Sequence, residues 1–263
     1  MRRIINKVKI YINGDDKSKS IKKLLEEKLK SFEIAYDDYD LAISIGGDGT
    51  FLKMVNENNF NSNIYFIGIN SGKLGFLEEI EPFKIDYLID KLNNNDFNIE
   101  EVSIGKIDII SKDSRDTFNF LNEVLIRKED LKVLKSSVFI DNEHLEDFTG
   151  DGLLVSTSTG STAYNLSFNG PIIYNKLNVL SLTPVAPINN SIYKSLTNSL
   201  IVNSNNKIRI ILNNHDINIM VDGKLKRFKN VCEINITIDN KKIKCLRIGD
   251  YNFIKRINSK ILS

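Results

Sequence analysis

Residues 41–50 of the chain, LAISIGGDGT, decide the fold of its first part. The first five residues are apolar or small and predict a buried β-strand, and residues 50–58 then predict a helix. The three glycines between them allow backbone conformations that other residues avoid, and they let the chain approach a ligand closely. A strand that runs through such a turn into a helix is typical of an open α/β sheet, where ligands bind at the carboxyl ends of the strands.

The same alternation of strand and helix extends over the first hundred residues. Short apolar runs at 8–12 and 64–69 predict two further strands. Apolar residues at helical spacing predict one helix that starts at Ser18 or Ser20 and ends near Ser31, and another over residues 85–92. We therefore expect residues 1–100 to form an α/β, Rossmann-like nucleotide-binding domain with a parallel sheet.

The pattern changes after the polar stretch 93–98. Strands are predicted over residues 103–111, 117–126, 137–140, 152–156, 208–212, 217–221 and 233–238, with helical signal only near 161–167. The pairs Asp141-Asn142 and Asp222-Gly223 are typical of hairpin turns. We expect residues 101–238 to form a β-rich, sandwich-type domain. A further strand over 241–248 is also predicted, and residues 239–263 are expected to pack back on the first domain.

Composition places the chain among ordinary globular proteins. Of its 263 residues, 41% are hydrophobic and 27% are charged, and a net charge of +2 gives no sign of nucleic-acid binding. The basic start MRRIINKVKI lacks the apolar core of a signal peptide, and no apolar run approaches the roughly 18 residues that a membrane span needs. We therefore expect a cytoplasmic protein that binds neither nucleic acid nor membranes.

The cysteines and histidines give little support for a disulfide or a zinc site. Cys232 and Cys245 could face each other across a hairpin, but nothing marks secretion, and free thiols are favoured. His144 and His215 are the only histidines, so a structural zinc site lacks ligands.

Asp48 is the unusual residue of the glycine-rich turn. The free N–H groups of the turn and the start of the following helix favour a polyanion, whereas a carboxylate there repels phosphate. Asp48 could accept a proton from an attacking hydroxyl or help to hold Mg²⁺; the alternative is a tight Asp-Gly turn without chemistry. Neither a Walker A motif, which the segment GINSGKL at 68–74 only approaches, nor a GxGxxG motif explains this site.

A second unusual segment, TGDGLLVSTSTGSTAYNLSFNGP, covers residues 149–171. Its small residues let the backbone close on a flat ligand, and its hydroxyl groups can satisfy the ligand's polar edges. Tyr164 offers a face for stacking. Asp151 could accept a hydrogen bond from an amide or a ribose hydroxyl. The alternative is a Ser/Thr-rich loop that caps a short helix.

Together these two segments resemble the NAD kinase family. GGDGT is shared with phosphofructokinases and with diacylglycerol and sphingosine kinases, whereas the stretch from Asp151 to Pro171 is far more specific. The segments GINSGKLGFL at 68–77, NE at 122–123, PINN at 187–190 and VDG at 221–223 are also similar to family motifs. The resemblance covers roughly residues 40 to 225.

The resemblance implies an activity and a set of partners. The protein would phosphorylate the 2′-hydroxyl of the adenosine ribose of NAD, which would lie between the two domains. The donor would be ATP or inorganic polyphosphate, with Mg²⁺ or Mn²⁺ as the divalent cation. A homodimer or homotetramer is implied, in which the NAD site can take residues from a neighbouring subunit. The alternatives are a lipid kinase of the diacylglycerol type and a dinucleotide sensor without catalytic activity.

The resemblance also implies a role for each matching residue. Asp48 would activate the 2′-hydroxyl. The donor phosphates would bind at Gly46, Gly47, Gly49 and Thr50. The NAD-binding residues would be Gly49, Phe76, Asn122, Glu123, Asp151, Thr159, Thr162, Ala163, Tyr164, Ser167, Ala186 and Ile188. The metal ion would be held mainly by the donor phosphates, with Glu123 as a possible protein ligand.

Three lysines and one threonine complete these expectations. Many relatives carry a basic residue where this chain has Thr149, so a charged contact is either missing or supplied elsewhere, and Lys224 is one candidate for it. Lys53 and Lys73 lie near the glycine-rich turns, but we expect both to be solvated surface residues.

Overall fold

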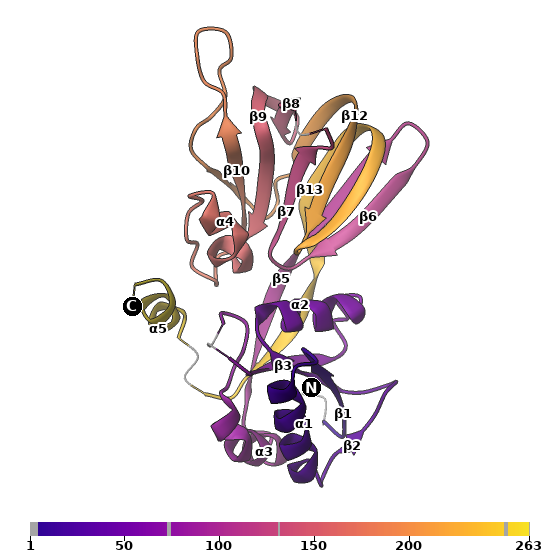
Figure 1. Ribbon diagram of the computed structural model, residues 1–263, viewed down its shortest axis with the longest axis vertical. Helices are drawn as coiled ribbons and strands as arrows, with labels where there is room; N and C mark the ends of the chain where they lie inside the picture. The colour runs from indigo at the N-terminus through magenta and orange to yellow at the C-terminus, as the bar shows by residue number, and fades with distance from the viewer. Residues whose placement is uncertain (1–4, 73–74, 131, 250–251, 263) are drawn as a thin grey trace. The chain divides into compact units, whose positions relative to one another are not determined.

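The computed structural model describes residues 5–72, 75–130, 132–249 and 252–262. The chain divides into two compact units (Figure 1). Unit 1 contains Met1–Val102 and Lys242–Ser263, and unit 2 contains Ser103–Lys241. The last segment of the chain therefore belongs to the same unit as the first hundred residues.

Unit 1 is built on a parallel sheet with the strand order β4-β3-β1-β2. The strands are β1 (Lys7–Ile12), β2 (Glu33–Ile34), β3 (Leu41–Gly46) and β4 (Tyr65–Asn70). Every residue of β3 and β4 is buried, as expected for central strands covered on both faces. The end of β13 (Lys224–Arg247) adds a parallel strand beside β4, through Lys244 and Cys245.

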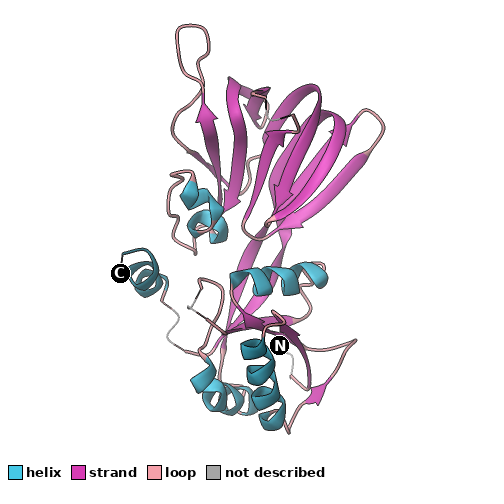
Figure 2. Cartoon of the chain, in the orientation of Figure 1, coloured by secondary structure: helices cyan, strands magenta, loops and turns pink. Residues whose placement is uncertain are grey.

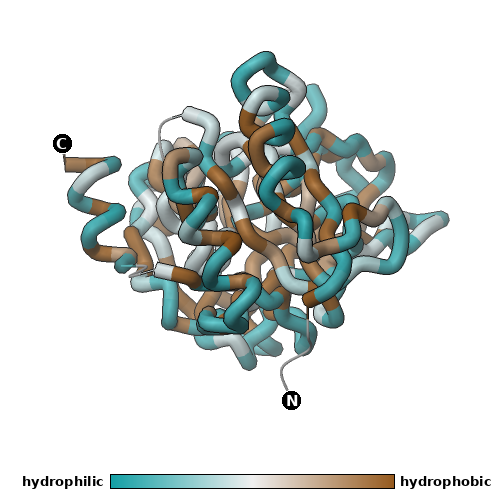
Figure 3. The backbone as a smooth tube through the Cα atoms, turned by 90° about the horizontal axis from the view of Figure 1, so that it is seen from below, coloured by the Kyte–Doolittle hydropathy of each residue, from teal (hydrophilic) through white to brown (hydrophobic). Residues whose placement is uncertain are grey.

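Helices cover both faces of this sheet (Figure 2). They are α1 (Asp16–Lys28), α2 (Asp48–Glu57) and α3 (Ile85–Asn93), with a 3₁₀ turn at Pro82–Lys84 before α3. The chain ends in α5 (Phe253–Ile257) and a π-helical turn (Asn258–Leu262), which do not cover the sheet. Leu41, Ile43 and Ile45 share one face of β3, because side chains alternate along a strand, and they pack in one core with residues of α1 and α3. In Figure 3 the helices change colour from turn to turn, as amphipathic helices do, whereas the strands behind them are mostly brown.

The start of α1 differs from the prediction. Asp15, not Ser18 or Ser20, caps the helix, because its Oδ1 accepts the N–H of Ser18 at 2.7 Å. Ser18 is buried on the core-facing side of the helix. The sequence offers several capping residues between positions 15 and 20, and only the fold decides which of them lies at the helix end.

Unit 2 is almost entirely β-structure. Its strands are β5 (Asn98–Ser111), β6 (Arg115–Phe120), β7 (Glu123–Lys128), β8 (Leu134–Ile140), β9 (Glu143–Thr157), β10 (Val179–Pro187), β11 (Leu200–Asn203), β12 (Ile208–Val221) and the first part of β13. Paired strands follow the order β11-β10-β9-β7-β12-β13. Like β7, β8 pairs with both β9 and β12. One apolar core takes residues from all of these strands. The fold class, an α/β domain followed by a β-rich domain, is confirmed.

Several predicted strands have different limits. The predicted strand 117–126 is broken at Leu121 and Asn122 into β6 and β7. The predicted strands 208–212 and 217–221 are parts of one long strand, β12, whose pairing register is irregular between Ile211 and His215. The predicted strands 233–238 and 241–248 likewise both fall on β13. β10 and β11 were not predicted. The two hairpin turns are confirmed, because Ile140 pairs with Glu143 and Val221 with Lys224.

Two further expectations concern the cysteines and the membrane. Cys232 and Cys245 are both free thiols, so they form no disulfide. Within the described ranges, no helix has the length and apolar character to cross a bilayer.

Candidate active site

The glycine-rich turn lies at the carboxyl end of β3. The strand ends at the buried Gly46, Gly47 is the N-cap of α2, and Asp48 is the first residue of the helix. Gly47 and Gly49 are exposed, whereas Thr50 is buried. A helix N-terminus presents N–H groups without intrahelical partners, so this turn is suited to bind an anionic phosphate group.

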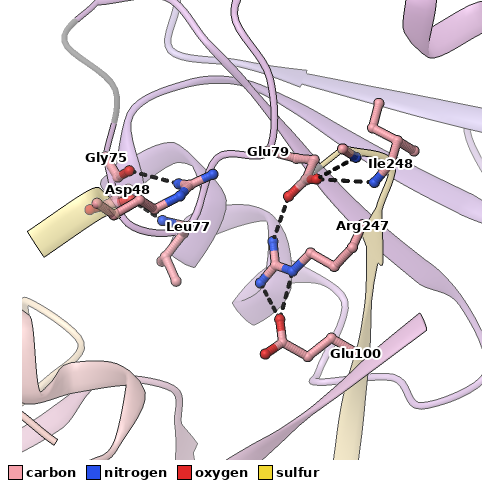
Figure 4. A network of polar contacts seen from close by, with 9 residues as sticks. Asp48, Gly75, Leu77, Glu79, Glu100, Arg247 and Ile248 are labelled. Atoms are coloured by element: carbon pink, nitrogen blue, oxygen red, sulfur yellow. Dashed lines mark hydrogen bonds and ion pairs between the residues drawn. The ribbon is translucent and has the colours of Figure 1, made fainter. Parts of the chain in front are cut away.

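Two backbone amides hold the side chain of Asp48. Its Oδ1 accepts the N–H of Leu77 at 2.8 Å, and its Oδ2 accepts the N–H of Phe76 at 3.1 Å. Asp48 is partly exposed, so its carboxylate keeps lone pairs for a further hydrogen bond. The guanidinium of Arg256 donates to the carbonyl oxygen of Gly75 at 2.9 Å, so the loop 75–77 is held from a second side (Figure 4).

Glu78 directly follows this loop and is fully buried. Burial and, after it, the negative charge of the neighbouring Asp48 raise the pKa of its carboxyl group to about 8. Sequence reasoning missed Glu78, although an acid placed directly after an apolar Gly-Phe-Leu segment is a signal that it could have used.

Glu79 ties the same segment to β13 through a shielded ion-pair network (Figure 4). Arg247 contacts Glu79 at 3.1 Å and donates through Nε to Glu100 at 2.6 Å. The other oxygen of Glu79 accepts the N–H groups of Ile248 and Gly249. The side chain of Glu79 is only 2% exposed, and these partners supply the hydrogen bonds that a buried carboxylate needs.

Phe76 and Lys53 complete the predicted residues of unit 1. The ring of Phe76 lies 6.2 Å from that of Phe253 on α5. Lys53 is exposed and forms an ion pair with Glu57 at 3.8 Å, which confirms it as a surface residue. Lys73 lies outside the described residues.

In unit 2, Asp222 shapes the backbone around Asn122 and Glu123. Its carboxylate accepts the N–H groups of Leu121 at 2.7 Å, Asn122 at 2.8 Å and Glu123 at 3.2 Å. These bonds turn the chain where one strand was predicted, which explains the break between β6 and β7. Asp222 itself lies in the hairpin turn with a positive φ of 45°, a conformation that Asp and Asn adopt more readily than most residues.

Glu123 is the second buried glutamate of the molecule. Burial and, after it, the charge of Asp222 raise the pKa of its carboxyl group to about 8, although the N–H of Tyr164 acts in the opposite direction. Its Oε2 and the Oδ1 of Asn122 are buried and have no hydrogen-bond partner within the part of the chain that the structure describes. Both atoms therefore lack the hydrogen bond that a buried polar atom ordinarily makes.

The hydroxyl-rich segment packs against this turn. The hydroxyl of Thr157 donates to the carbonyl oxygen of Leu121 at 2.5 Å. A Cβ atom at Gly160 would lie 2.1 Å from the carbonyl oxygen of Asn122, so only glycine fits there. The fold thus brings together the predicted residues Asn122, Glu123, Thr159, Thr162, Ala163 and Tyr164, the last four from the 3₁₀ turn Thr159–Thr162 and the start of α4 (Tyr164–Ser167).

Ser167 and Ala186 line a cavity of about 680 Å³ in unit 2. Phe168 also lines it and packs its ring 4.9 Å from that of Tyr164. Beneath it, the buried Asn165 accepts a hydrogen bond from the hydroxyl of Thr183 at 2.8 Å. This apolar and hydroxyl-bearing wall has the composition of a small-molecule site.

Asp151 lies on β9, and Ile188 directly follows β10, the strand that pairs with β9. Ile188 donates its N–H to the carbonyl oxygen of Thr149 at 2.8 Å. Thr149 is buried, so its side chain does not replace a surface cation. Arg127 on the neighbouring strand β7 approaches Asp151 at 3.7 Å and places a positive charge there, which sequence reasoning missed. Lys224 is exposed at the β12–β13 turn.

The carboxylates do not form a preformed metal cage. Within the described residues, no group of three or more His, Cys, Asp or Glu side chains is arranged to hold a metal ion. Mg²⁺ is commonly bound through one or two carboxylates together with substrate phosphates. The unpaired oxygen of Glu123 fits that mode as a single ligand.

Comparison with known proteins identifies both halves of the chain. The model of the ATP-NAD kinase N-terminal domain matches residues 8–97, and that of the ATP-NAD kinase C-terminal domain matches residues 121–248. An NAD kinase of Finegoldia magna is 37% identical over 248 residues, 90% of each chain. An NAD kinase of Staphylococcus aureus strain Newman is 31% identical over 260 residues, 97% of each chain.

Solved structures show the same fold at lower identity. Yeast NADH kinase complexed with NADH aligns with a TM-score of 0.87 and 20% identity, covering 99% of this chain and 88% of that one. An NAD kinase of Archaeoglobus fulgidus in complex with ATP aligns with a TM-score of 0.76 and 21% identity, covering 96% and 99%. With both family models matched in order and relatives of 31% and 37% identity covering nine tenths or more of its length, this chain belongs to the NAD kinase family.

Proposed function

We propose that this NAD kinase transfers a phosphoryl group to the 2′-hydroxyl of the adenosine ribose of NAD, with Asp48 as the general base. One observation carries the assignment: Asp48 lies at the glycine-rich helix start, fixed by two backbone amides, and remains partly exposed. A base so placed can take the hydroxyl proton as the new O–P bond forms and the donor's P–O bond breaks. Gly46, Gly47, Gly49 and Thr50 would hold the donor phosphates.

Unit 2 is assigned the binding of NAD. The buried, unpaired oxygens of Asn122 and Glu123 support contacts to the adenosine and its ribose hydroxyls. Phe76 and Gly49 from unit 1 and Thr159, Thr162 and Ala163 from unit 2 would line the adenosine end. The cavity beside Ser167 and Ala186 would take the nicotinamide end, together with Asp151, Tyr164 and Ile188.

The donor, the cation and the assembly are part of the same proposal. ATP or inorganic polyphosphate would supply the phosphoryl group, as the ATP-bound relative supports for ATP, and the NADH-bound relative supports the acceptor class. Mg²⁺ or Mn²⁺ would neutralise charge on the donor oxygens, with Glu123 as the candidate protein ligand. We expect a cytoplasmic homodimer or homotetramer. The family membership favours this activity over a lipid kinase or a catalytically inactive sensor.

The variant Asp48→Asn tests the base. We expect turnover to fall by about 10²–10⁴-fold, because an amide cannot take the proton, while the affinity for NAD stays within about threefold. Turnover is measured as NADP formation from NAD, Mg²⁺ and each donor in turn, and the affinity for NAD is measured by calorimetry. Glu57→Gln, at the exposed far end of α2, is the matched control and should keep full turnover. Turnover of Asp48→Asn near that of the wild type would overturn the assignment.

A further inference from the structure

Glu78 is a buried acid whose ionised form is disfavoured by its surroundings. It is fully buried, and neither carboxylate oxygen has a hydrogen-bond partner among the residues that the structure describes. Its Cα and Cγ atoms pack so closely against Gly68 of β4 that no side chain would fit there. An ionised carboxylate in such a place is strongly disfavoured unless it is paired.

A neighbouring polar group of Glu78 is another carboxylate, that of Asp48. A Cβ atom placed on Gly75 would lie 2.3 Å from Oε2 of Glu78 and 2.3 Å from Oδ1 of Asp48, so the two oxygens converge on the space that this glycine leaves open. Two acceptors cannot bond to each other without a proton between them. One proton on the pair supplies that bond and removes one of two adjacent negative charges.

The other charged groups around the pair do not replace that proton. On α5, Arg256 donates to the carbonyl oxygen of Gly75. The adjacent Glu79 is directed to Arg247 on β13. From β4, Gly68 lies against Glu78, and from α2 the facing charge is Asp48 itself. None of these contacts places a cation on an oxygen of Glu78.

We propose that Glu78 is a positioning residue for Asp48: it keeps a proton, donates it to a carboxylate oxygen of Asp48 and so holds the pair at a single negative charge. The inference rests on the proposed function of Asp48 as the base. Before transfer, Asp48 is ionised and Glu78 is protonated. Asp48 then takes the proton of the attacking hydroxyl as the O–P bond forms, the donor's P–O bond breaks with its electron pair leaving on the donor, and the pair is left with two protons. One proton returns to solvent when the product has left.

This arrangement makes activity fall at alkaline pH. When the pair loses its last proton, two negative charges face the phosphates of the donor, and Asp48 loses the bond that orients it. The pKa of Glu78 of about 8 puts this fall above neutral pH. A glutamine at position 78 still donates through its amide and cannot ionise.

Three proteins test the proposal: the wild type, Glu78→Gln and Glu78→Met, with kcat and KM for NAD measured from about pH 6 to pH 10. We expect Glu78→Gln to stay within about threefold of wild-type kcat at pH 7 and to keep its activity where the wild type declines. Glu78→Met removes the donor at similar volume, so its kcat should fall about tenfold or more at every pH, with KM for NAD little changed. Thermal unfolding of each variant shows whether it is folded.

Two results would overturn the role of Glu78. One is superimposable pH profiles of the wild type and Glu78→Gln. The other is a Glu78→Gln protein that does not fold, because a neutral isostere should be accepted where the acid is neutral. Either result, combined with an inactive Asp48→Asn, leaves the base assignment standing. An active Asp48→Asn removes the base and the role of Glu78 with it.

Discussion

Each unit of the molecule holds one aspartate that binds backbone N–H groups beside one buried glutamate. In unit 1, Asp48 accepts two N–H groups and lies next to Glu78. In unit 2, Asp222 accepts three N–H groups and lies next to Glu123. Both glutamates have a pKa of about 8, with burial as the first cause.

The two aspartates differ in what remains free on their carboxylates. Asp222 directs its carboxylate inward to three amides, and burial raises its pKa to about 6 in spite of them. Among the described residues, Asp48 accepts only two backbone N–H groups, and it lies between the exposed residues Gly47 and Gly49. The same local arrangement can therefore act as a structural brace where three amides occupy the carboxylate, and can offer a reactive carboxylate where only two do so and exposed glycines flank it.

Replacing Asp222 with alanine should give the largest loss of stability. The N–H groups of Leu121, Asn122 and Glu123 are buried and would lose their acceptor, and each unsatisfied buried donor costs about 1–3 kcal/mol. Alanine also adopts the positive φ of this position poorly. We expect the free energy of unfolding, measured by urea denaturation, to fall by about 3 kcal/mol or more. Asp222→Asn keeps one acceptor oxygen and should lose about 1 kcal/mol.

The matched change in unit 1 tests whether the two aspartates really differ. Asp48→Ala also removes an acceptor of backbone amides, but water can reach this turn and take its place. We expect its loss of stability to be about 1 kcal/mol, clearly less than that of Asp222→Ala. Equal losses in the two variants would mean that Asp48 is as much a structural brace as Asp222.

The sequence predicted the part of this comparison that depends on local chemistry. Gly46 to Thr50 lie between a strand and a helix as predicted, because alternating apolar runs and glycines act over a few residues. Asn122, Glu123 and the segment 159–164 also come together as expected for one site. Their roles in binding NAD remain predictions.

The residues that complete each site depend on contacts far apart in the chain. The pKa of Glu78 is raised by burial and then by Asp48, thirty residues earlier, and the break between β6 and β7 is imposed by Asp222, about a hundred residues later. Arg127 reaches Asp151 only because β7 pairs with β9. No local pattern marks these partners, because the distances that matter are set by strand pairing.

The two buried glutamates should make stability depend on pH. Each folded pKa of about 8 lies above the ordinary value of 4.5, so between about pH 5 and pH 8 the folded protein keeps a proton that the unfolded chain releases. Raising the pH through this window therefore lowers the free energy of unfolding. Glu78→Gln and Glu123→Gln do not titrate at these sites. Each should gain about 4 kcal/mol relative to the wild type over the roughly three units of the window, at about 1.4 kcal/mol for each pKa unit.

Urea denaturation at both ends of the pH window, with a chelator present, measures these gains. Glu57→Gln on the exposed end of α2 serves as the control and should show no gain. Similar gains from both variants would support burial as the common cause. No gain from either would contradict the neutral state of both acids.

Lys224 should have the smallest effect, because it acts on Asp222 from the solvent side. Its positive charge lowers the pKa of Asp222, against the larger effect of burial. In Lys224→Gln that pKa should rise further above its unfolded value, so stability at pH 7 should fall, by about 0.5 kcal/mol for an exposed charge. The loss should shrink in concentrated salt, which screens exposed charges. Lys229→Gln, exposed on the same strand, is the control; an equal loss there would show that net charge, and not the contact with Asp222, is responsible.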